Sequence, residues 1–351
     1  MKVLSRFYID GFILAIVTTV GLASVFPASG AAADVVGLAA KIAIGLLFLI
    51  YGARLSPKEA WQGVKHWKLH SVILGVTFVV FPLLGLVLRI LLPSVLTEEL
   101  YTGILFLCLV PSTVQSSIAF TSIARGNVAG AVVSASLSNL VGVLVTPLLV
   151  ILVMNTTGDV NVDASSIVAI VFQLLVPFLA GQLLRPWIGA WLKRNVKPTK
   201  LVDRGSILLV IYAAFSESMN ENIWSTVEPE QIAVLAAVCV VLLTAVLGVT
   251  VLIGKVLGFS VEDRIVILFC GSKKSLASGL PMAAALFSGS QVGLTVLPLM
   301  LFHQIQLIIC AIVAQRFAGR LSPVGSTSSS ISRQQGVRLS GPPSTSTAPG
   351  K

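Results

Sequence analysis

The stretch Phe269-Cys-Gly-Ser-Lys-Lys-Ser-Leu-Ala-Ser-Gly-Leu-Pro-Met282 places two adjacent lysines, three serines, two glycines and a proline inside a long apolar run. A lysine costs about 2.5–3.5 kcal/mol at the centre of a membrane helix. Gly271, Gly279 and Pro281 also weaken the local helix and leave backbone groups in need of partners. Such a segment survives at membrane depth only where it is buried in protein or lines a wet cavity. The stretch therefore predicts a broken helix over 271–281, at a substrate or ion site.

The composition around this stretch is that of a membrane protein. Of 351 residues, 56% are hydrophobic and 11% are charged, whereas soluble domains have about 25% charged residues. Apolar runs of about 20 residues, the length that crosses a bilayer as a helix, recur along the chain. A membrane barrel would instead show alternating segments of about 10 residues. We therefore expect an all-α, polytopic protein embedded in the lipid bilayer.

The apolar runs predict ten transmembrane helices. They cover residues 7–27, 35–53, 70–92, 101–124, 127–154, 164–184, 205–217, 230–257, 261–288 and 292–318. The fourth run is interrupted at Pro111 and the ninth at the two lysines. Residues 321–351 are rich in Ser, Thr, Pro and Gly, which cannot offset the entropy lost on ordering. We expect a transmembrane domain over 1–320 and a disordered cytoplasmic tail over 321–351.

The charged residues predict the orientation. Loops after the even-numbered runs hold Arg54, Lys58, Lys65, Lys68, Arg125, Arg185, Lys193, Arg194, Lys197, Lys200, Arg204, Lys255 and Arg264, and the opposite loops hold Asp34, Glu98, Glu99, Asp159, Asp163, Glu217, Glu221, Glu228 and Glu230. Basic loops stay in the cytoplasm, so both termini are expected there. The net charge of +10 thus reflects membrane topology and does not indicate a nucleic-acid partner. We expect the inner membrane of a bacterium, with an organelle membrane as the alternative.

Dividing ten helices into two halves, over about 5–157 and 158–320, puts an odd number in each, so the halves cross the bilayer in opposite directions. The fourth helix of each half is the polar, interrupted one: Leu109-Val-Pro-Ser-Thr-Val-Gln-Ser-Ser117 in the first and Cys270-Gly-Ser-Lys-Lys-Ser275 in the second. A single proline kink is ordinary in membrane helices. Two matching breaks in inverted halves instead predict a transport site near the midplane.

The fifth run adds polar groups at the same depth. Ser134 and Ser138 lie one turn apart on one helix face, next to Asn139. Serines at this spacing also let helices pack closely, whereas a buried amide needs partners. Hydroxyl and amide oxygens suit a hard cation such as Na⁺. Helix packing and cation binding both stay open for this run.

The stretches 111–127, 134–139 and 271–281 resemble the bile acid:sodium symporter superfamily, in the branch of bacterial symporters related to the seventh member of solute carrier family 10. The resemblance covers about residues 5–320. It implies ten helices in two inverted five-helix repeats. It also implies a panel domain of helices 1, 2, 6 and 7 and a core domain of helices 3–5 and 8–10, with helices 4 and 9 crossing at their breaks. The function that it implies is sodium-coupled uptake of organic anions by alternating access.

The family's polar residues carry over onto this chain residue by residue. The expected ion-binding positions are Gln115, Ser116, Ser117, Ser134, Ser138 and Asn139. The expected positions for substrate, or for a cation that replaces sodium, are Ser272, Lys273, Lys274, Ser275, Thr77, Pro111 and Thr113. Na⁺ is the expected coupling ion, with no other metal and no cofactor.

This sequence departs from the family at the ninth-helix break. The family's glutamate has no counterpart, since its position falls on Phe269 or Cys270, and the glutamine that follows it becomes Lys273. A fixed ammonium at a cation site can replace the ion itself. Our hypothesis is that Lys273 or Lys274 fills the second cation site and leaves at most one sodium.

These features predict a secondary active transporter of a small organic anion, coupled to Na⁺. An H⁺-coupled or uncoupled carrier, with a lysine in place of a sodium ion, is one alternative. A membrane regulator of calcium homeostasis that does not transport is another. An enzyme is not expected, because the histidines at 66, 70 and 303 accompany no acid pair and no HExxH motif. The four cysteines lie within apolar runs without CxxC spacing, so buried thiols are expected rather than disulfides or zinc.

Overall fold

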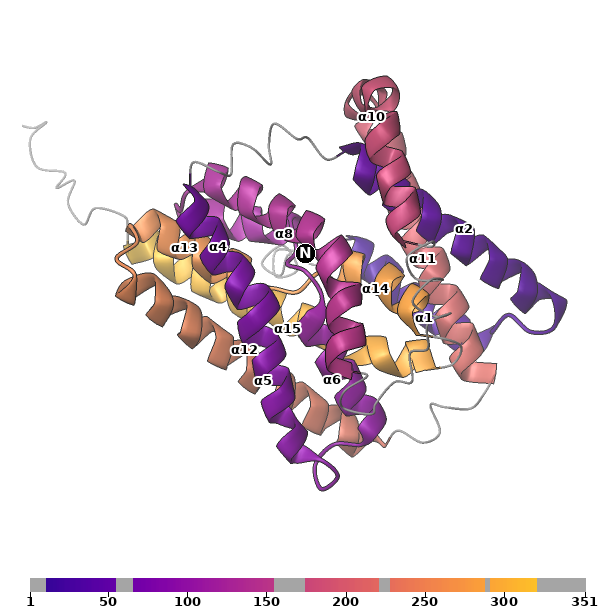
Figure 1. Cartoon of the computed structure of the whole chain (residues 1–351). Coiled ribbons are helices and arrows are strands. Elements are labelled where there is room, and N and C mark those ends of the chain that lie inside the picture. Colours follow the sequence, from indigo (N-terminus) through magenta and orange to yellow (C-terminus); the bar gives the residue numbers. More distant parts are fainter. Residues whose placement is uncertain (1–10, 55–65, 155–173, 221–227, 288–290, 321–351) are drawn as a thin grey trace, which may run out of the picture.

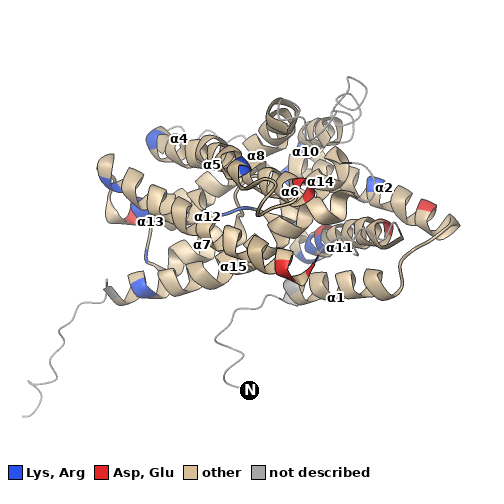
Figure 2. Cartoon of the chain, turned by 90° about the horizontal axis from the view of Figure 1, so that it is seen from below, with Lys and Arg blue, Asp and Glu red and all other residues tan. Residues whose placement is uncertain are grey.

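The computed structural model describes residues 11–54, 66–154, 174–220, 228–287 and 291–320, and this part of the chain is helical, with no strand. Five of its helices are long and apolar enough to cross a membrane: Ala31–Arg54, Trp67–Leu91, Val128–Met154, Pro229–Val256 and Gln291–Gly319. A shorter apolar helix covers Leu14–Val25. Charged residues gather mostly near helix ends, with long uncharged stretches between them (Figure 2). The predicted all-α membrane architecture is confirmed, and the count of ten spans stays a prediction.

One group of helices lies together on one side of the molecule (Figure 1). It comprises α1 (Gly11–Val25), α2 (Ala31–Arg54), α10 (Val176–Arg194) and α11 (Val196–Asn220). Helix α11 is tied to the turn after α1 by two hydrogen bonds, from Tyr212 Oη to Phe26 O (2.9 Å) and from Asn220 Nδ2 to Ala28 O (2.6 Å). At the other end of the group, Arg54 on α2 pairs with Asp203 on α11. These contacts fix both ends of the group.

Helices α2 and α10 touch backbone to backbone. A Cβ atom built on Gly52 would lie 2.0 Å from the carbonyl oxygen of Phe178, and one built on Gly181 would lie 2.0 Å from that of Leu49. No side chain fits at either position, so only glycine permits this approach. The α2–α10 pair is therefore a rigid unit whose geometry depends on two glycines.

The remaining helices form a second group, which contains both breaks (Figure 1). It comprises α4 (Trp67–Gly75), η3 (Val76–Val80), α5 (Phe81–Val87), η4 (Leu88–Leu91), α6 (Glu98–Leu109), α7 (Gln115–Ile123), α8 (Val128–Leu149), η5 (Val150–Met154), α12 (Pro229–Val256), α13 (Val261–Gly271), α14 (Leu276–Leu286) and α15 (Gln291–Arg320). Side-chain oxygens cap several of them: Thr97 accepts from the N–H of Leu100, and Ser260 from that of Asp263. Such caps satisfy N–H groups that the first helical turn leaves unpaired.

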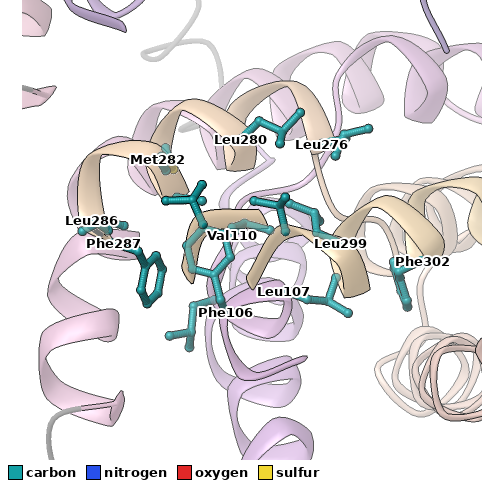
Figure 3. Packing of buried hydrophobic residues seen from close by; sticks show 14 of the residues in the cluster. Phe106, Leu107, Val110, Leu276, Leu280, Met282, Leu286, Phe287, Leu299 and Phe302 are labelled. Carbon is teal, nitrogen blue, oxygen red and sulfur yellow. The ribbon is translucent and has the colours of Figure 1, made fainter. Parts of the chain in front are cut away.

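A continuous apolar core joins α6, α14 and α15 beside the breaks. Figure 3 shows the side chains of Phe106 and Val110 among those of Leu280, Phe287 and Leu299. The rings of Phe106 and Phe287 meet edge to face, with centroids 5.3 Å apart, an arrangement that aromatic quadrupoles favour. All four cysteines are buried and unpaired, as expected from their apolar neighbours. The breaks are thus embedded in protein.

Two predicted helix boundaries are wrong. The helix expected over 205–217 begins at Val196, because Pro198 lies in its first turn, where a missing N–H breaks no bond. The helix expected over 164–184 continues to Arg194, through Pro186. Proline removes one hydrogen bond there, but the surrounding turns pack on α2 through Gly181 and hold the helix. Residues 164–173 and the predicted tail over 321–351 lie outside the described residues.

Candidate functional site

The fourth and ninth predicted helices are both interrupted, and their breaks touch. Helix α6 ends at Leu109 and α7 begins at Gln115, while α13 ends at Gly271 and α14 begins at Leu276. Segments 110–114 and 272–275 therefore interrupt the helical hydrogen bonding, although the N–H of Ser272 still bonds to Leu268 O and Val114 O still accepts from the N–H of Ile118. Backbone groups at such breaks need partners from elsewhere in the protein when the site is at membrane depth.

Two hydrogen bonds join the breaks directly. The N–H of Ser275 donates to the carbonyl oxygen of Pro111 (2.8 Å), and Ser112 Oγ donates to that of Cys270 (2.6 Å). Each break therefore satisfies a backbone group of the other. Pro111, expected at a substrate position, contributes its carbonyl oxygen to this contact.

The carbonyl groups at the end of α6 receive their remaining partners from other helices. Lys274 Nζ donates to the carbonyl oxygens of Cys108 and Val110, at 2.8 Å each. Thr146 Oγ1, on α8, donates to that of Leu109 (2.9 Å). The last carbonyls of a helix carry a partial negative charge that favours a cation. The ammonium of Lys274 is that cation.

The third predicted helix supplies one more acceptor. In a widened turn ahead of Pro82, the N–H of Phe81 bonds to Val76 O, five residues back, rather than to Thr77 O. The carbonyl oxygen of Thr77 is thereby released and accepts from Lys274 Nζ at 2.9 Å. The hydroxyl of Thr77 donates to a carbonyl of its own helix. Thr77 thus serves the site through its backbone and not through its side chain.

Lys274 is therefore fully coordinated. Its Nζ donates to three carbonyl oxygens and lies 4.1 Å from the ring centroid of Phe81. Hydrogen bonds from a charged group each contribute about 1.5–3 kcal/mol. A cation surrounded by backbone carbonyl oxygens at a helix end is the arrangement that a bound metal ion would otherwise have. The replacement of a sodium ion by a lysine of this break stays a prediction.

Gln306 holds the backbone of the same lysine. Its Nε2 donates to Lys274 O (2.8 Å), and its Oε1 accepts from the N–H of Lys274 (2.9 Å). Its Nε2 also lies 2.8 Å from His303 Nδ1. Sequence reasoning did not place Gln306 in the site, although a buried amide in an apolar run was a usable signal. Gln306 fixes the second break to α15.

Lys273 has very different surroundings. It is fully buried, and Nζ has no hydrogen-bond partner among the residues that the structure describes. The ammonium lies over the ring of Phe120, 3.7 Å from its centroid, and 5.7 Å from that of Phe269. A desolvated cation–π contact contributes about 2 kcal/mol, less than the several kcal/mol lost by a buried ion. The aromatic rings thus offset the burial of this charge only in part.

Serine hydroxyls bond to three carbonyl oxygens in the last turn of α13, shortly before Lys273 in the sequence. Ser117 Oγ donates to Phe269 O (3.0 Å) and Ser112 Oγ to Cys270 O, while Ser272 bonds back to Leu268 O. These hydroxyls satisfy the last carbonyls of α13. Ser117 and Ser272, both expected at the site, therefore stabilise the end of α13.

Two of the predicted cation ligands on α8 also have protein partners. Ser134 Oγ lies 2.8 Å from His70 Nδ1, on α4. Ser138 Oγ accepts from the N–H of Ser112 at 3.1 Å. Both side chains are buried and join α8 to neighbouring segments. Their contacts are those of helix packing, one of the two interpretations left open by the sequence.

Asn139 instead belongs to a chain of side-chain oxygens. Ser278 Oγ donates to Asn139 Oδ1 (2.8 Å), and Ser275 Oγ donates to Ser278 Oγ (3.0 Å). Ser275 also caps α14 by accepting from the N–H of Ser278. Ser278 was not predicted, although it lies three residues after Ser275 on the same helix. These three oxygens combine amide and hydroxyl groups, as a hard cation prefers.

The remaining predicted positions lie at the start of α7. Ser116 Oγ donates to Thr113 Oγ1 over 3.4 Å, and both residues are half-buried. Gln115 is exposed. Sequence spacing alone could not separate these residues from the buried Ser117, because the break shifts the register of α7.

Comparison with known proteins gives a consistent picture. A model of the SBF-like CPA transporter family matches residues 10–319. An uncharacterized protein of Pseudomonas aeruginosa is 53% identical over 315 residues, covering 90% of this chain and 95% of the relative. YfeH of Escherichia coli K12, described as a candidate symporter, is 48% identical over 309 residues, covering 88% and 93%. Sodium/bile acid cotransporter 7 of Rattus norvegicus is 29% identical over 353 residues, covering 97% and 99%.

Proposed function

Because the chain belongs to the SBF-like CPA transporter family, we propose that it is a secondary transporter that moves a small organic anion together with Na⁺ by alternating access. The predicted resemblance to the bile acid:sodium symporters is confirmed by the family match and by the relatives. The chain is thus an integral membrane protein of a transporter family and not an enzyme. The substrate class and the coupling ion are the proposal.

The observation that carries the proposal is the contact between two broken helices around a coordinated lysine. Ser275 and Pro111 join the breaks, and Lys274 binds three carbonyl oxygens beside them. Burying two lysines in an apolar interior costs free energy. Their presence at the contact between the breaks therefore indicates that the site needs them. Broken helices at membrane depth, with unwound backbone turned inward, are the construction of transporter sites.

The charge at the crossing supports an anionic substrate. Lys273 and Lys274 are adjacent and fully buried, and neither forms an ion pair with a carboxylate of the described chain. An anion bound near the contact between the breaks would lie beside two basic side chains, one of them the fixed ammonium of Lys274. The relative from Rattus norvegicus is named a sodium/bile acid cotransporter. We assign to this chain the broader class, a small organic anion.

The sodium ion is assigned to the oxygens of Asn139, Ser275 and Ser278. Lys274 takes the place of a second cation, because its ammonium already neutralises the carbonyl groups at the end of α6. We therefore propose one coupling Na⁺ and one fixed ammonium. Ser134, Ser138 and Ser117 bond instead to His70 or to backbone groups of neighbouring segments and are assigned to the framework.

Alternating access requires two bodies that move past each other. We propose that α1, α2, α10 and α11 form the panel and that the helices around the breaks form the core. The glycine contact between α2 and α10 supports a panel that moves as one piece. We keep the ten helices, the inverted repeats over 5–157 and 158–320, the bacterial inner membrane and the cytoplasmic termini as parts of the same proposal.

Sodium binding is tested by thermal unfolding of the purified protein, titrated with NaCl or with KCl at equal ionic strength. A ligand that binds only the folded state stabilises it by RT ln(1 + [L]/Kd). We expect stabilisation by Na⁺ over K⁺ that is lost in Asn139→Ala and in Ser278→Ala. The matched control is Ser134→Ala, which removes a predicted ligand bonded to His70 and should keep the sodium response. Equal curves in the two salts would refute the sodium site.

A further inference from the structure

Lys273 is a buried amine that the proposed sodium site does not use. Its side chain is fully buried, and Nζ has no hydrogen-bond acceptor among the described residues. Lys274, next in sequence, donates three hydrogen bonds on the other side of the break. The two lysine side chains at the second break therefore have different contacts: three hydrogen bonds for Lys274, and aromatic rings for Lys273. A lysine that only stabilised the break would be expected to resemble Lys274.

The surroundings of Lys273 contain no counter-charge. Phe120 on α7 and Phe269 on α13 present their rings to the ammonium. The titratable groups that face it are two thiols, Cys270 on α13 and Cys310 on α15. No carboxylate forms an ion pair with it in the part of the chain that the structure describes. Within the described part of the chain, the positive charge is compensated by aromatic faces alone.

The carbonyl oxygens at the end of α13 do not serve Lys273 either. Serine hydroxyls occupy those of Phe269 and Cys270. An ammonium that is desolvated, unpaired and without acceptors is unstable compared with the neutral amine, whose methylene chain keeps the same packing. Burial without a partner thus costs the neutral side chain much less free energy than the charged one.

From this asymmetry we propose that Lys273 is a proton-binding site, which takes up and releases a second coupling ion, H⁺, during the transport cycle. In the step, one N–H bond of the ammonium breaks, the electron pair stays on Nζ, and the proton passes to water on the side to which the site opens. Uptake from the other side reverses the step. The proposal rests on the transport function above and assigns separate roles to the two lysines: Lys274 is a fixed cation, and Lys273 carries an exchangeable proton.

The experiment uses the full chain reconstituted in proteoliposomes on a solid-supported membrane, with no organic substrate. A step to lower external pH should evoke a transient current in the wild type, because protonation of Lys273 moves positive charge into the protein. The variant Lys273→Gln should give only the current of protein-free liposomes. The variant Lys255→Gln, changed at an exposed lysine in the last turn of α12, should keep the transient. Gel filtration and thermal unfolding check that each variant is folded.

Two further variants keep the test decisive if Lys273→Gln does not fold. Lys273→Met preserves the apolar packing, and Lys273→Arg preserves the charge but cannot release its proton; both should abolish the transient. A transient that persists in the folded Lys273 variants overturns the proposal, and so does its absence from the wild type. Sodium-dependent stabilisation without any proton current would overturn this inference alone. A proton current without a sodium response would refute the sodium site and leave this inference standing.

Discussion

At the scale of single residues, we expect opposite effects on stability from replacing the two adjacent lysines, Lys273 and Lys274. Replacing Lys274 by Met leaves three buried carbonyl oxygens without a donor, each costing about 1–3 kcal/mol. We expect Lys274→Met to lower the free energy of unfolding by several kcal/mol and to lower the unfolding temperature clearly. Lys273→Met removes a buried charge without a hydrogen-bond partner and should be neutral or stabilising. Thermal unfolding in the same detergent compares the two, and an equal loss in both variants would contradict the difference.

Gln306 gives a second prediction at this scale. Gln306→Leu removes both hydrogen bonds to the backbone of Lys274 and leaves its N–H and C=O buried without partners. We expect a loss of about 2–4 kcal/mol, from one unsatisfied donor and one unsatisfied acceptor. Gln304→Leu, a half-buried neighbour on α15, is the matched control and should change stability by no more than about 0.5 kcal/mol. Similar thermal shifts for the two variants would show that the hydrogen bonds between Gln306 and the backbone of Lys274 contribute nothing to stability.

The sequence could predict that the lysines belong to the site but not which one replaces a cation. Two adjacent ammonium groups in an apolar run are anomalous on their own, whatever surrounds them. The partners of Lys274, however, are backbone carbonyls of Thr77, Cys108 and Val110. Every residue has a carbonyl, so no residue type marks these acceptors. Only the fold decides which carbonyls a helix leaves unpaired.

At the scale of elements, the contact between α2 and α10 depends on single glycines. A methyl group at Gly52 would meet the backbone of Phe178 at 2.0 Å, which no side-chain movement can relieve. We expect Gly52→Ala to force the helices apart and cost about 1–3 kcal/mol or more. Gly45→Ala, one heptad earlier on α2, meets only Pro177 at 3.9 Å and should gain up to about 1 kcal/mol from helix propensity. Unfolding temperatures that change in the same direction would contradict the close approach.

Breaks were the elements easiest to predict, because proline, glycine and lysine mark them in the sequence itself. The interruptions at 110–114 and 272–275 lie where Pro111 and the two lysines indicated. The ends of α10 and α11 were harder, since Pro186 and Pro198 also suggest helix ends but are tolerated in these helices. Packing against α2 holds α10 through Pro186, whereas Pro198 lies in the first turn of α11, where its missing N–H breaks no bond. The widened turn before Pro82 likewise had no separate signal beyond the proline.

At the scale of the whole molecule, the distribution of charge predicts which face of the membrane each loop occupies. The end of α6 that carries Glu98 and Glu99 is expected outside the cytoplasm, and Arg125, after α7, inside it. Alkaline phosphatase, which is active only outside the cytoplasm, reports this in fusions. We expect activity for a fusion after Glu99 and none for fusions after Arg125 or Arg320. The reverse pattern would invert the proposed topology, and activity at both Glu99 and Arg125 would refute a span between them.

The lysine that completes the end of α6 also imposes an order on synthesis. Val110 and Lys274 are 164 residues apart, so at about 5–20 residues per second the ribosome needs on the order of ten to thirty seconds to reach the lysine. During that interval α6 is already made, but the carbonyl oxygens of Cys108 and Val110 at its end have no donor from the unfinished half. Ser112 and Ser117, in contrast, are synthesised before α13, so their hydroxyls can bond to its last carbonyl oxygens as soon as it is made. The nascent chain therefore passes through a half-built state with an open helix end, and that interval is when insertases and membrane proteases compete for it.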